Sequence, residues 1–244
     1  ADKVLQMGVT KILEEIYEQD FRGCSYGYRP HVGALDAVRD LSAALRSGRY
    51  HFLVEADIRR FFDRIDHDRL VTLLRQRIAD ERFLRLIQKW LKAGVLEPDG
   101  TVQHPEQGSP QGGIVSPVLA NVYLHYALDV WFEDTVKAHC KGQAFLCRYA
   151  DDFVCAFECA TDAERFYRVL GARLATFGLE VAPEKTQLLR FSRQDVARNG
   201  TFEFLGFEFR WAHGRWGKPM LKRRTSRRKY RAALASFHTW CRQH

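Results

Sequence analysis

The chain has 244 residues, 46% of them hydrophobic and 28% charged, and a formal net charge of +8. That much apolar side chain can build a core, which excludes an intrinsically disordered chain. No apolar run approaches the roughly 18 residues of a membrane span. The six cysteines lack the paired spacing of a zinc site, and in a chain this long they argue against a disulfide scaffold. We therefore expect a cytoplasmic protein with no membrane partner.

The first half of the chain predicts helices around one strand. Apolar residues at helical spacing predict helices over 4–17, 32–45, 67–79 and 81–93. Gly48 suits the end of the second helix, and Asp66 and Asp80 suit the N-caps of the last two. Between them, 50–56 is short, β-prone and apolar, which predicts a buried strand that ends at Asp57.

The second half mixes strands and helices. Residues 97–115 are rich in turn formers and lead into a helix to about 138, with Ser116 as its cap. Strands are predicted over 145–149, 153–157, 187–191 and 202–210, with a hairpin return near 215–222. Thr161 and Glu164 form a capping box for a helix that ends at Gly178, and a last helix over 226–242 is expected to bury Tyr230, Leu234, Phe237 and Trp240. Without strict βαβ alternation, this order predicts an α+β fold with helices on one face of an antiparallel sheet.

The positive charge is concentrated at the C-terminal end. Residues 210–244 hold eleven Lys or Arg and no acidic residue, which leaves 27 basic against 30 acidic residues in 1–209. The densest part, 222–231, includes Arg223, Arg224, Arg227, Arg228 and Lys229. A run of this kind neutralises phosphates, whereas a merely solvated helix face usually carries interspersed acidic residues. We therefore expect this basic segment (222–231) to bind nucleic acid.

Three carboxylates have no simple structural explanation. Asp57 ends an apolar strand, and Asp151 and Asp152 lie together between two apolar strands. Although Asp suits turns, two adjacent like charges destabilise each other unless a cation or water screens them. A hairpin beside the strand that ends at Asp57 would bring all three to one rim of a sheet. Hard oxygen ligands without His or Cys suit Mg²⁺, and two such ions support phosphoryl transfer on a polynucleotide.

Six segments then resemble a known series of blocks in one order. They are SYGYRP (25–30), EADIRRFFDRIDHDRL (55–70), QGSPQGGIVSPVLANVYLHYALD (107–129), RYADDFV (148–154), GLEVAPEKT (178–186) and FEFLGFEF (202–209). The series resembles the group II intron-encoded reverse transcriptase/maturase family. The resemblance implies a polymerase right hand: partial fingers over 1–50, a palm over 51–215 with finger-side insertions at about 75–115, and the start of a thumb or maturase region over 216–244.

The resemblance also implies roles for individual residues. Asp57, Asp151 and Asp152 would hold two Mg²⁺ ions, with Mn²⁺ as a substitute, and Lys185 would lie near the incoming triphosphate as a proton donor. Phe62 would be the steric gate that excludes a ribonucleotide 2′-hydroxyl. The same block series assigns Ile58 and Gln111 to the nucleotide pocket, Tyr149, Phe204, Leu205 and Gly206 to the primer grip, and Arg29 and Tyr26 to a template-side or structural role.

The implied activity is RNA-directed DNA polymerisation, with an RNA template, a DNA primer, dNTPs and intron RNA as partners. The Arg and Lys that bind the triphosphate in the family precede the start of this sequence, so we expect the fragment to polymerise poorly on its own. Alternatives remain open: a non-catalytic maturase-type RNA-binding module, a CRISPR-associated or retron-like reverse transcriptase, and an RNA-dependent RNA polymerase. The last would favour a small or hydrogen-bonding residue at Phe62.

Overall fold

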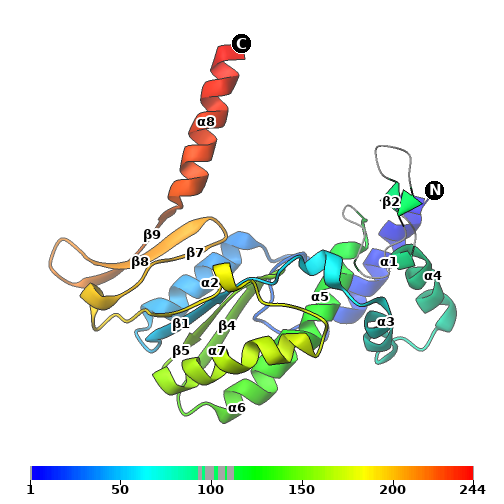
Figure 1. The fold of residues 1–244 in the computed structure, drawn as a ribbon, viewed down its shortest axis with the longest axis horizontal. Helices are drawn as coiled ribbons and strands as arrows, with labels where there is room; N and C mark the ends of the chain where they lie inside the picture. Colours follow the sequence, from blue (N-terminus) through cyan, green and yellow to red (C-terminus); the bar gives the residue numbers. More distant parts are fainter. Residues whose placement is uncertain (1, 93–94, 97–101, 104–107, 109–112, 244) are drawn as a thin grey trace.

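A computed structural model describes residues 2–92, 95–96, 102–103, 108 and 113–243, and shows an α+β fold with its helices and strands arranged around one sheet (Figure 1). The helices are α1 (Asp2–Tyr17), α2 (Ala34–Arg46), α3 (His67–Arg75), α4 (Glu81–Lys92), α5 (Ser116–Leu124), α6 (Lys137–His139), α7 (Ala160–Ala175) and α8 (Arg227–Gln243). The strands are β1 (Phe52–Ala56), β2 (Val95–Leu96), β3 (Val102–Gln103), β4 (Ala144–Tyr149), β5 (Asp152–Phe157), β6 (Gln187–Arg190), β7 (Phe202–Phe204), β8 (Phe207–His213) and β9 (Pro219–Thr225). In the described part of the chain, no helix is long and apolar enough to cross a membrane.

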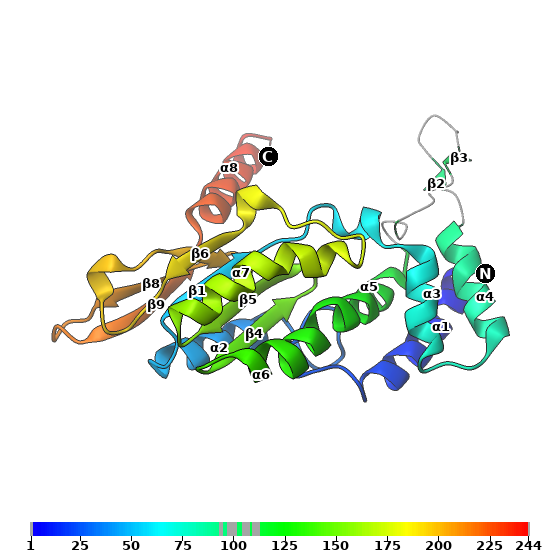
Figure 2. The same cartoon turned by 60° about the horizontal axis from the view of Figure 1, so that its bottom comes forward.

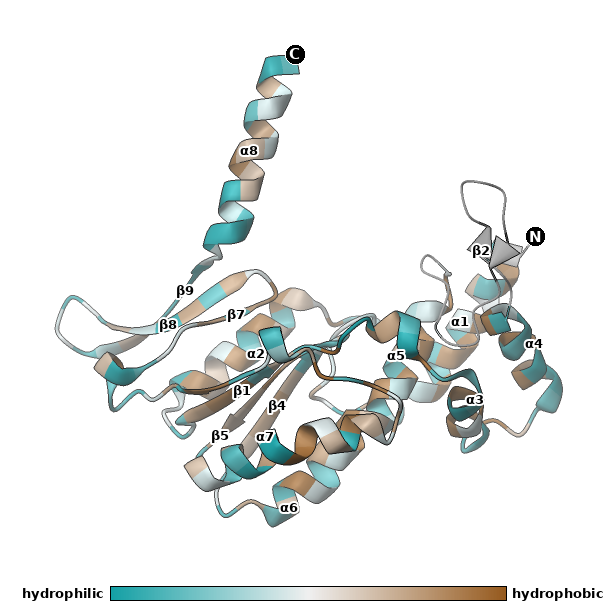
Figure 3. Ribbon diagram, viewed as in Figure 1, coloured by the Kyte–Doolittle hydropathy of each residue, from teal (hydrophilic) through white to brown (hydrophobic). Residues whose placement is uncertain are grey.

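The central sheet has four antiparallel strands in the order β4-β5-β1-β6. Its two middle strands are buried on both sides, because consecutive residues face opposite cores: Val54 packs in one cluster and Leu53 in the other. Figure 3 shows the central strands in brown, as their apolar sequences require. The strands predicted at 50–56, 145–149, 153–157 and 187–191 are therefore confirmed.

Both faces of this sheet are covered. Helix α7 contacts β1, β5 and β6 on one face, with the helical segment that begins at α5 beside it (Figure 2). On the other face, α2 contacts β4 and β9, and the three-stranded sheet β7-β8-β9 adds to the same core. The α+β fold with an antiparallel sheet is confirmed, but helices cover both faces of the sheet rather than one. The alternation of residues along a strand shows that both faces are buried and does not show which elements cover them.

The helix predicted over 116–138 is continuous but changes its winding. After α5, residues His125–Asp129 and Trp131–Val136 form π-helical turns before α6. Such turns leave backbone carbonyls without their usual partners. The guanidinium of Arg173 supplies two donors, to the carbonyls of Tyr126 (2.7 Å) and Ala127 (2.9 Å), and lies over the rings of Trp131 and Phe177. This contact ties α7 to the preceding helical segment.

Two predicted helix caps are wrong. The helix at 116 has Val115 as its N-cap, with Pro117 just inside the helix, and α7 begins after Cys159 with no side-chain cap hydrogen bond. The capping box expected at Thr161 thus lies inside the first turn. The caps Asp66 and Asp80 are confirmed, since their carboxylates accept backbone N–H groups of α3 and α4.

Two further expectations at the C-terminal end are wrong. Residues 202–210 form two antiparallel strands rather than one, because Leu205 (φ 50°) and Gly206 (φ 80°) make a two-residue turn between β7 and β8. Helix α8 leaves the body at its first turn (Figure 1), so its apolar side chains have no core to enter. Those of Tyr230, Leu234, Phe237 and Trp240 are 50–62% exposed.

Candidate active site

Backbone hydrogen bonds between residues 57–59 and residues 180–182 hold Asp57 at the end of β1. Its carbonyl accepts the Ala182 N–H at 2.8 Å, and the Arg59 N–H donates to the Glu180 carbonyl at 2.8 Å. The Arg59 guanidinium adds ion pairs to Glu180 and Glu184. These contacts fasten the chain after β1 to the segment that carries Lys185.

Asp151 and Asp152 lie in the tight turn of the β4–β5 hairpin, which we call the catalytic turn (149–152) after its predicted role. Tyr149 pairs with Asp152 across the turn, and Ala150 adopts a left-handed conformation with φ 55°. Strand β5 also pairs with β1, with Ala56 opposite Phe153. Because these strands are antiparallel, this register places position 57 opposite position 152 at the same end of the sheet.

The electrostatics of this end of the sheet reflect crowded negative charge. Burial raises the pKa of Asp152 to about 7, with the carboxylates of Asp57 and Glu55 adding to the effect. Burial also raises the pKa of Asp151, again with a contribution from Asp57. Burial and neighbouring negative charges both favour the neutral form of a carboxylic acid, so a nearby cation would stabilise the ionised form.

Lys185 supplies one such cation. Its ammonium donates to Asp57 Oδ2 at 2.5 Å, and this hydrogen bond is the main cause of its raised pKa. The side chain of Lys185 is 63% exposed, so it can leave Asp57 without losing buried contacts. The lysine predicted from the PEKT segment therefore lies beside the first predicted metal ligand.

The donor set suits a hard divalent cation, because the three aspartates offer only oxygen ligands. Their present arrangement is not a formed metal site: among the described residues, no three His, Cys, Asp or Glu side chains are grouped closely enough to hold an ion. Instead, the Lys185 ammonium forms an ion pair with the Asp57 carboxylate. A metal ion would thus have to displace this ammonium and draw the carboxylates of the catalytic turn together.

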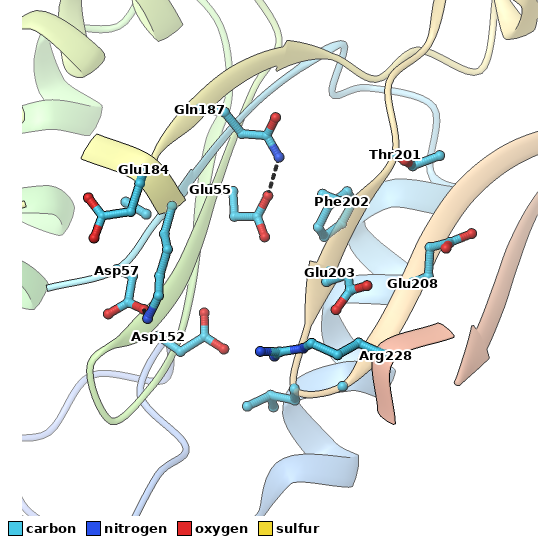
Figure 4. Close-up of a pocket in the computed structure, with 14 residues that line it drawn as sticks. Glu55, Asp57, Asp152, Glu184, Gln187, Thr201, Phe202, Glu203, Glu208 and Arg228 are labelled. Carbon is cyan, nitrogen blue, oxygen red and sulfur yellow. Dashed lines mark hydrogen bonds and ion pairs between the residues drawn. The ribbon is translucent and has the colours of Figure 1, made fainter. Parts of the chain in front are cut away.

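A cavity of about 510 Å³ opens beside Asp57 and Asp152. Figure 4 shows Asp57, Asp152 and Glu55 on one wall, with Gln187 donating to Glu55 at 2.5 Å. The opposite wall is the β7–β8 hairpin, and Arg228 extends from the start of α8 toward Asp152. The cavity therefore joins the carboxylate rim to the turn predicted as the primer grip.

That turn is held by the beginning of α8. The Gly206 carbonyl accepts the Ser226 N–H at 2.9 Å, and a Cβ at Gly206 would lie 2.4 Å from Lys229 Nζ. Leu205 and Gly206 both line the cavity, whereas the ring of Phe204 is buried in the core. Any contact of Phe204 with a primer must therefore come through its backbone.

A buried polar network supports the catalytic turn from below. Arg148 is fully buried and makes a two-bond ion pair with Asp129, at 2.7 and 2.5 Å. Its remaining donors reach the Asn121 side chain (3.2 Å), the Ser25 hydroxyl (2.7 Å) and the Ala150 carbonyl (3.0 Å). The last bond fixes the left-handed residue of the turn directly. The sequence signal for this network is an arginine in an otherwise apolar strand, FLCRY.

The residues predicted to line the nucleotide pocket differ in their exposure. Phe62 is half-buried at the start of a short 3-10 helix (Phe61–Arg64), in edge contact with Phe61 at a centroid distance of 5.4 Å. Ile58 is 2% exposed in the core and bridges to Val181, so its side chain is not available to a nucleotide. A role in a nucleotide pocket would therefore fall to the backbone of Ile58. Gln111 lies outside the described residues.

The polar groups of Arg29 and Tyr26 have partners inside the protein, which favours the structural of the two expected roles. The Arg29 guanidinium pairs with Glu18 at 2.7 and 2.9 Å and donates to the carbonyls of Arg22 and Ser25. The buried Tyr26 donates its hydroxyl to Asp40 at 3.0 Å. A template-side role for Arg29 would require its guanidinium to leave Glu18, so that role stays a prediction.

The basic segment runs from the end of β9 into α8 and is mostly exposed. Arg224 pairs with Glu208 at 2.6 Å, and Arg223 lies over the Phe207 ring at 5.2 Å. Arg227, Arg228 and Lys229 form the first turn of α8, where Arg228 faces the cavity. The positive charge therefore begins at the edge of the carboxylate site and continues along α8.

The sequence of this chain is similar to those of several known proteins. A family model described as reverse transcriptase (RNA-dependent DNA polymerase) matches residues 1–209. The group II intron-encoded protein LtrA of Lactococcus lactis is 43% identical over 124 residues, which are 51% of this chain and 20% of that protein. The protein YkfC of Escherichia coli is 32% identical over 181 residues, covering 63% of this chain and 47% of its own length. The chain thus spans less than half of these curated relatives.

Solved structures agree on the fold. A telomerase from Candida albicans in complex with a TWJ fragment of telomeric RNA has a TM-score of 0.62 at 13% identity, over 84% of this chain and 36% of that one. An apo telomerase from Candida tropicalis has a TM-score of 0.61 at 13% identity, over 85% of this chain and 39% of that one. At such low identity the likeness concerns the arrangement of helices and strands.

Proposed function

The chain belongs to the reverse transcriptase (RNA-dependent DNA polymerase) family, and from this membership we propose that it forms the catalytic palm of a group II intron-type reverse transcriptase. The activity is nucleotidyl transfer that copies RNA into cDNA. Residues 1–50 act as partial fingers, 51–215 as the palm and 216–244 as the start of the thumb. The single observation that carries the proposal is the placement of Asp57 opposite Asp152 at one end of the sheet.

Asp57, Asp151 and Asp152 would hold two Mg²⁺ ions, which together activate an attacking hydroxyl and stabilise a leaving phosphate oxygen. For this, Lys185 must release Asp57, and its exposed ammonium is free to turn toward the triphosphate. There it can donate a proton to the departing pyrophosphate, as a general acid. The raised pKa of Asp152 fits a carboxylate that becomes fully ionised only when a cation arrives.

The strands of a primer–template duplex would lie along the cavity beside these residues. Leu205 and Gly206 offer a backbone turn for the primer end, and Arg228 offers a guanidinium for a nearby phosphate. The rest of the basic segment would bind the sugar–phosphate backbone, with an RNA template, a DNA primer, dNTPs and intron RNA as partners. Such binding weakens as salt rises, because each phosphate contact releases counterions.

The test is single-nucleotide primer extension on an RNA template with Mg²⁺ or Mn²⁺. We expect Asp151→Asn to abolish incorporation, because it removes a metal ligand, while the affinity for RNA is unchanged. Asp134→Asn, on an exposed ion pair with Arg22, is the matched control and should keep full activity. If Asp151→Asn incorporates as well as the unaltered chain, the catalytic assignment is wrong. If the unaltered chain binds RNA but binds no Mn²⁺ at these aspartates, a maturase-type RNA-binding module becomes the better description.

A further inference from the structure

Tyr28 contacts two aromatic residues, of which one is proposed to face the incoming nucleotide and the other to lie beside the primer end. Its ring meets that of Phe62 at a centroid distance of 6.5 Å and an interplanar angle of 73°, and that of Tyr149 at 6.3 Å and 43°. The first contact is edge-to-face, a geometry that aromatic pairs favour. Phe62 is the proposed sugar gate and Tyr149 the proposed neighbour of the primer end, so one side chain contacts both.

The backbone holds Tyr28 in an unusual conformation. Its φ is 56°, in the left-handed region that a tyrosine rarely adopts. The preceding Gly27 lies against the catalytic turn so closely that a Cβ there would be 2.4 Å from the Ala150 nitrogen. The Asn121 side chain also donates to the Gly27 carbonyl at 2.5 Å. Strained residues persist where the surroundings fix them, and such residues gather at functional sites.

The ring also lies beside the catalytic turn, because it contacts Tyr149. Tyr28 is 45% exposed, so its ring is not part of the hydrophobic core. Burial raises the pKa of the Tyr28 hydroxyl, and the negative charge of Asp151 adds to the effect. Tyr28 therefore reaches from the turn after Gly27 to the edge of the carboxylate site.

We propose that Tyr28 is a positioning residue for sugar selectivity, which braces Phe62 where the nucleotide's 2′ position would lie and Tyr149 beside the primer end. This inference rests on the function proposed above. With the ring present, Phe62 cannot swing away, and a 2′-hydroxyl meets aromatic carbon and loses its hydration. Without the ring, Phe62 gains room and the hydroxyl is admitted.

The experiment measures kcat/KM for a dNTP and for the matching rNTP in single-nucleotide incorporation. We expect Tyr28→Ala to lower the preference for the dNTP about three- to tenfold, the range expected for losing an aromatic contact. Tyr28→Phe retains the ring and should keep the preference. Tyr167→Ala, which removes a 40% exposed tyrosine from α7, is the matched control and should leave it unchanged.

Tyr28→Gly separates the ring from the backbone, because glycine adopts positive φ without strain. It should lower the preference as far as Tyr28→Ala does, even if the alanine variant melts at a lower temperature. An unchanged dNTP/rNTP ratio in both variants overturns the inference, as does an equal loss for both sugars. Failure of the proposed function looks different: Asp151→Asn then incorporates both nucleotides as well as the unaltered chain does, and the inference falls with it.

Discussion

Arg148 and Asp129 form a fully buried ion pair directly beneath the catalytic turn, joined by hydrogen bonds of 2.7 and 2.5 Å. A buried pair of this kind contributes little net stability over an apolar pair of the same volume, yet breaking it leaves a charge unpaired in the core. Arg148 also donates to the Ala150 carbonyl within the turn. We interpret the pair as the support that fixes the turn.

Replacing the two charges separately and together tests this interpretation. Arg148→Met alone should lower the free energy of unfolding by about 3–5 kcal/mol, because Asp129 remains charged and buried. Adding Asp129→Leu should recover most of this stability in urea denaturation. Primer extension should stay low in the double variant, since Ala150 has still lost its donor. Full activity in the double variant would show that the pair serves the fold alone.

Gly27→Ala is expected to disturb the catalytic turn. The added Cβ would lie 2.4 Å from the Ala150 backbone nitrogen, so one of the two segments must move. Overpacking of this kind lowers the free energy of unfolding by about 1–3 kcal/mol, and incorporation should fall with it. Gly23→Ala meets nothing within 4 Å and is the control. Equal melting temperatures and activities for the two variants would contradict the contact.

The buried His125 should make the free energy of unfolding depend on pH. Burial lowers the pKa of His125 from 6.5, so the unfolded chain binds a proton more readily than the folded one. The contribution of His125 to the free energy of unfolding should therefore fall as the pH drops below about 6.5, by at most about 1.4 kcal/mol per pH unit, whereas the raised pKa of Asp152 contributes in the opposite direction. His125→Phe should reduce this slope, whereas His238→Phe on the exposed face of α8 should not. Denaturation curves at several pH values measure both, and identical slopes for all three proteins would contradict the assignment.

Phe62→Ala tests the sugar gate itself. Removing the ring should raise rNTP incorporation and reduce the dNTP preference about 10- to 100-fold, as expected when a pocket no longer excludes one hydroxyl. Phe61→Leu alters the neighbouring ring, which is buried in the core, and should change stability more than selectivity. An unchanged dNTP/rNTP ratio in Phe62→Ala would remove the gate assignment.

The sequence predicted the parts of this fold that depend on local pattern. The apolar strands, the caps Asp66 and Asp80, and the hairpin around Asp151 all follow from residue spacing and turn chemistry. The break at Leu205–Gly206 also had a signal, because a glycine inside a strand pattern often marks a turn. The wrong helix caps differ by one or two positions, which is the usual uncertainty of helix ends.

What could not be predicted depends on contacts between distant segments. Arg148 meets Ser25, Asn121 and Asp129 only after the fold brings three elements together. Exposure of the apolar stripe on α8 depends on what lies beside the helix, which a periodic pattern does not reveal. The inward turn of Ile58 and the pairing of Arg29 with Glu18 likewise follow from packing rather than from sequence neighbours.

Binding of Mn²⁺, followed by electron paramagnetic resonance with primer–template and a dNTP present, tests the central claim most directly. We expect tight Mn²⁺ binding by the unaltered chain, with the ion displacing Lys185 from Asp57. That binding should be lost in both Asp57→Asn and Asp151→Asn and kept in Asp134→Asn. Equal Mn²⁺ affinity in all four proteins would contradict the claim that these aspartates converge on a shared metal site.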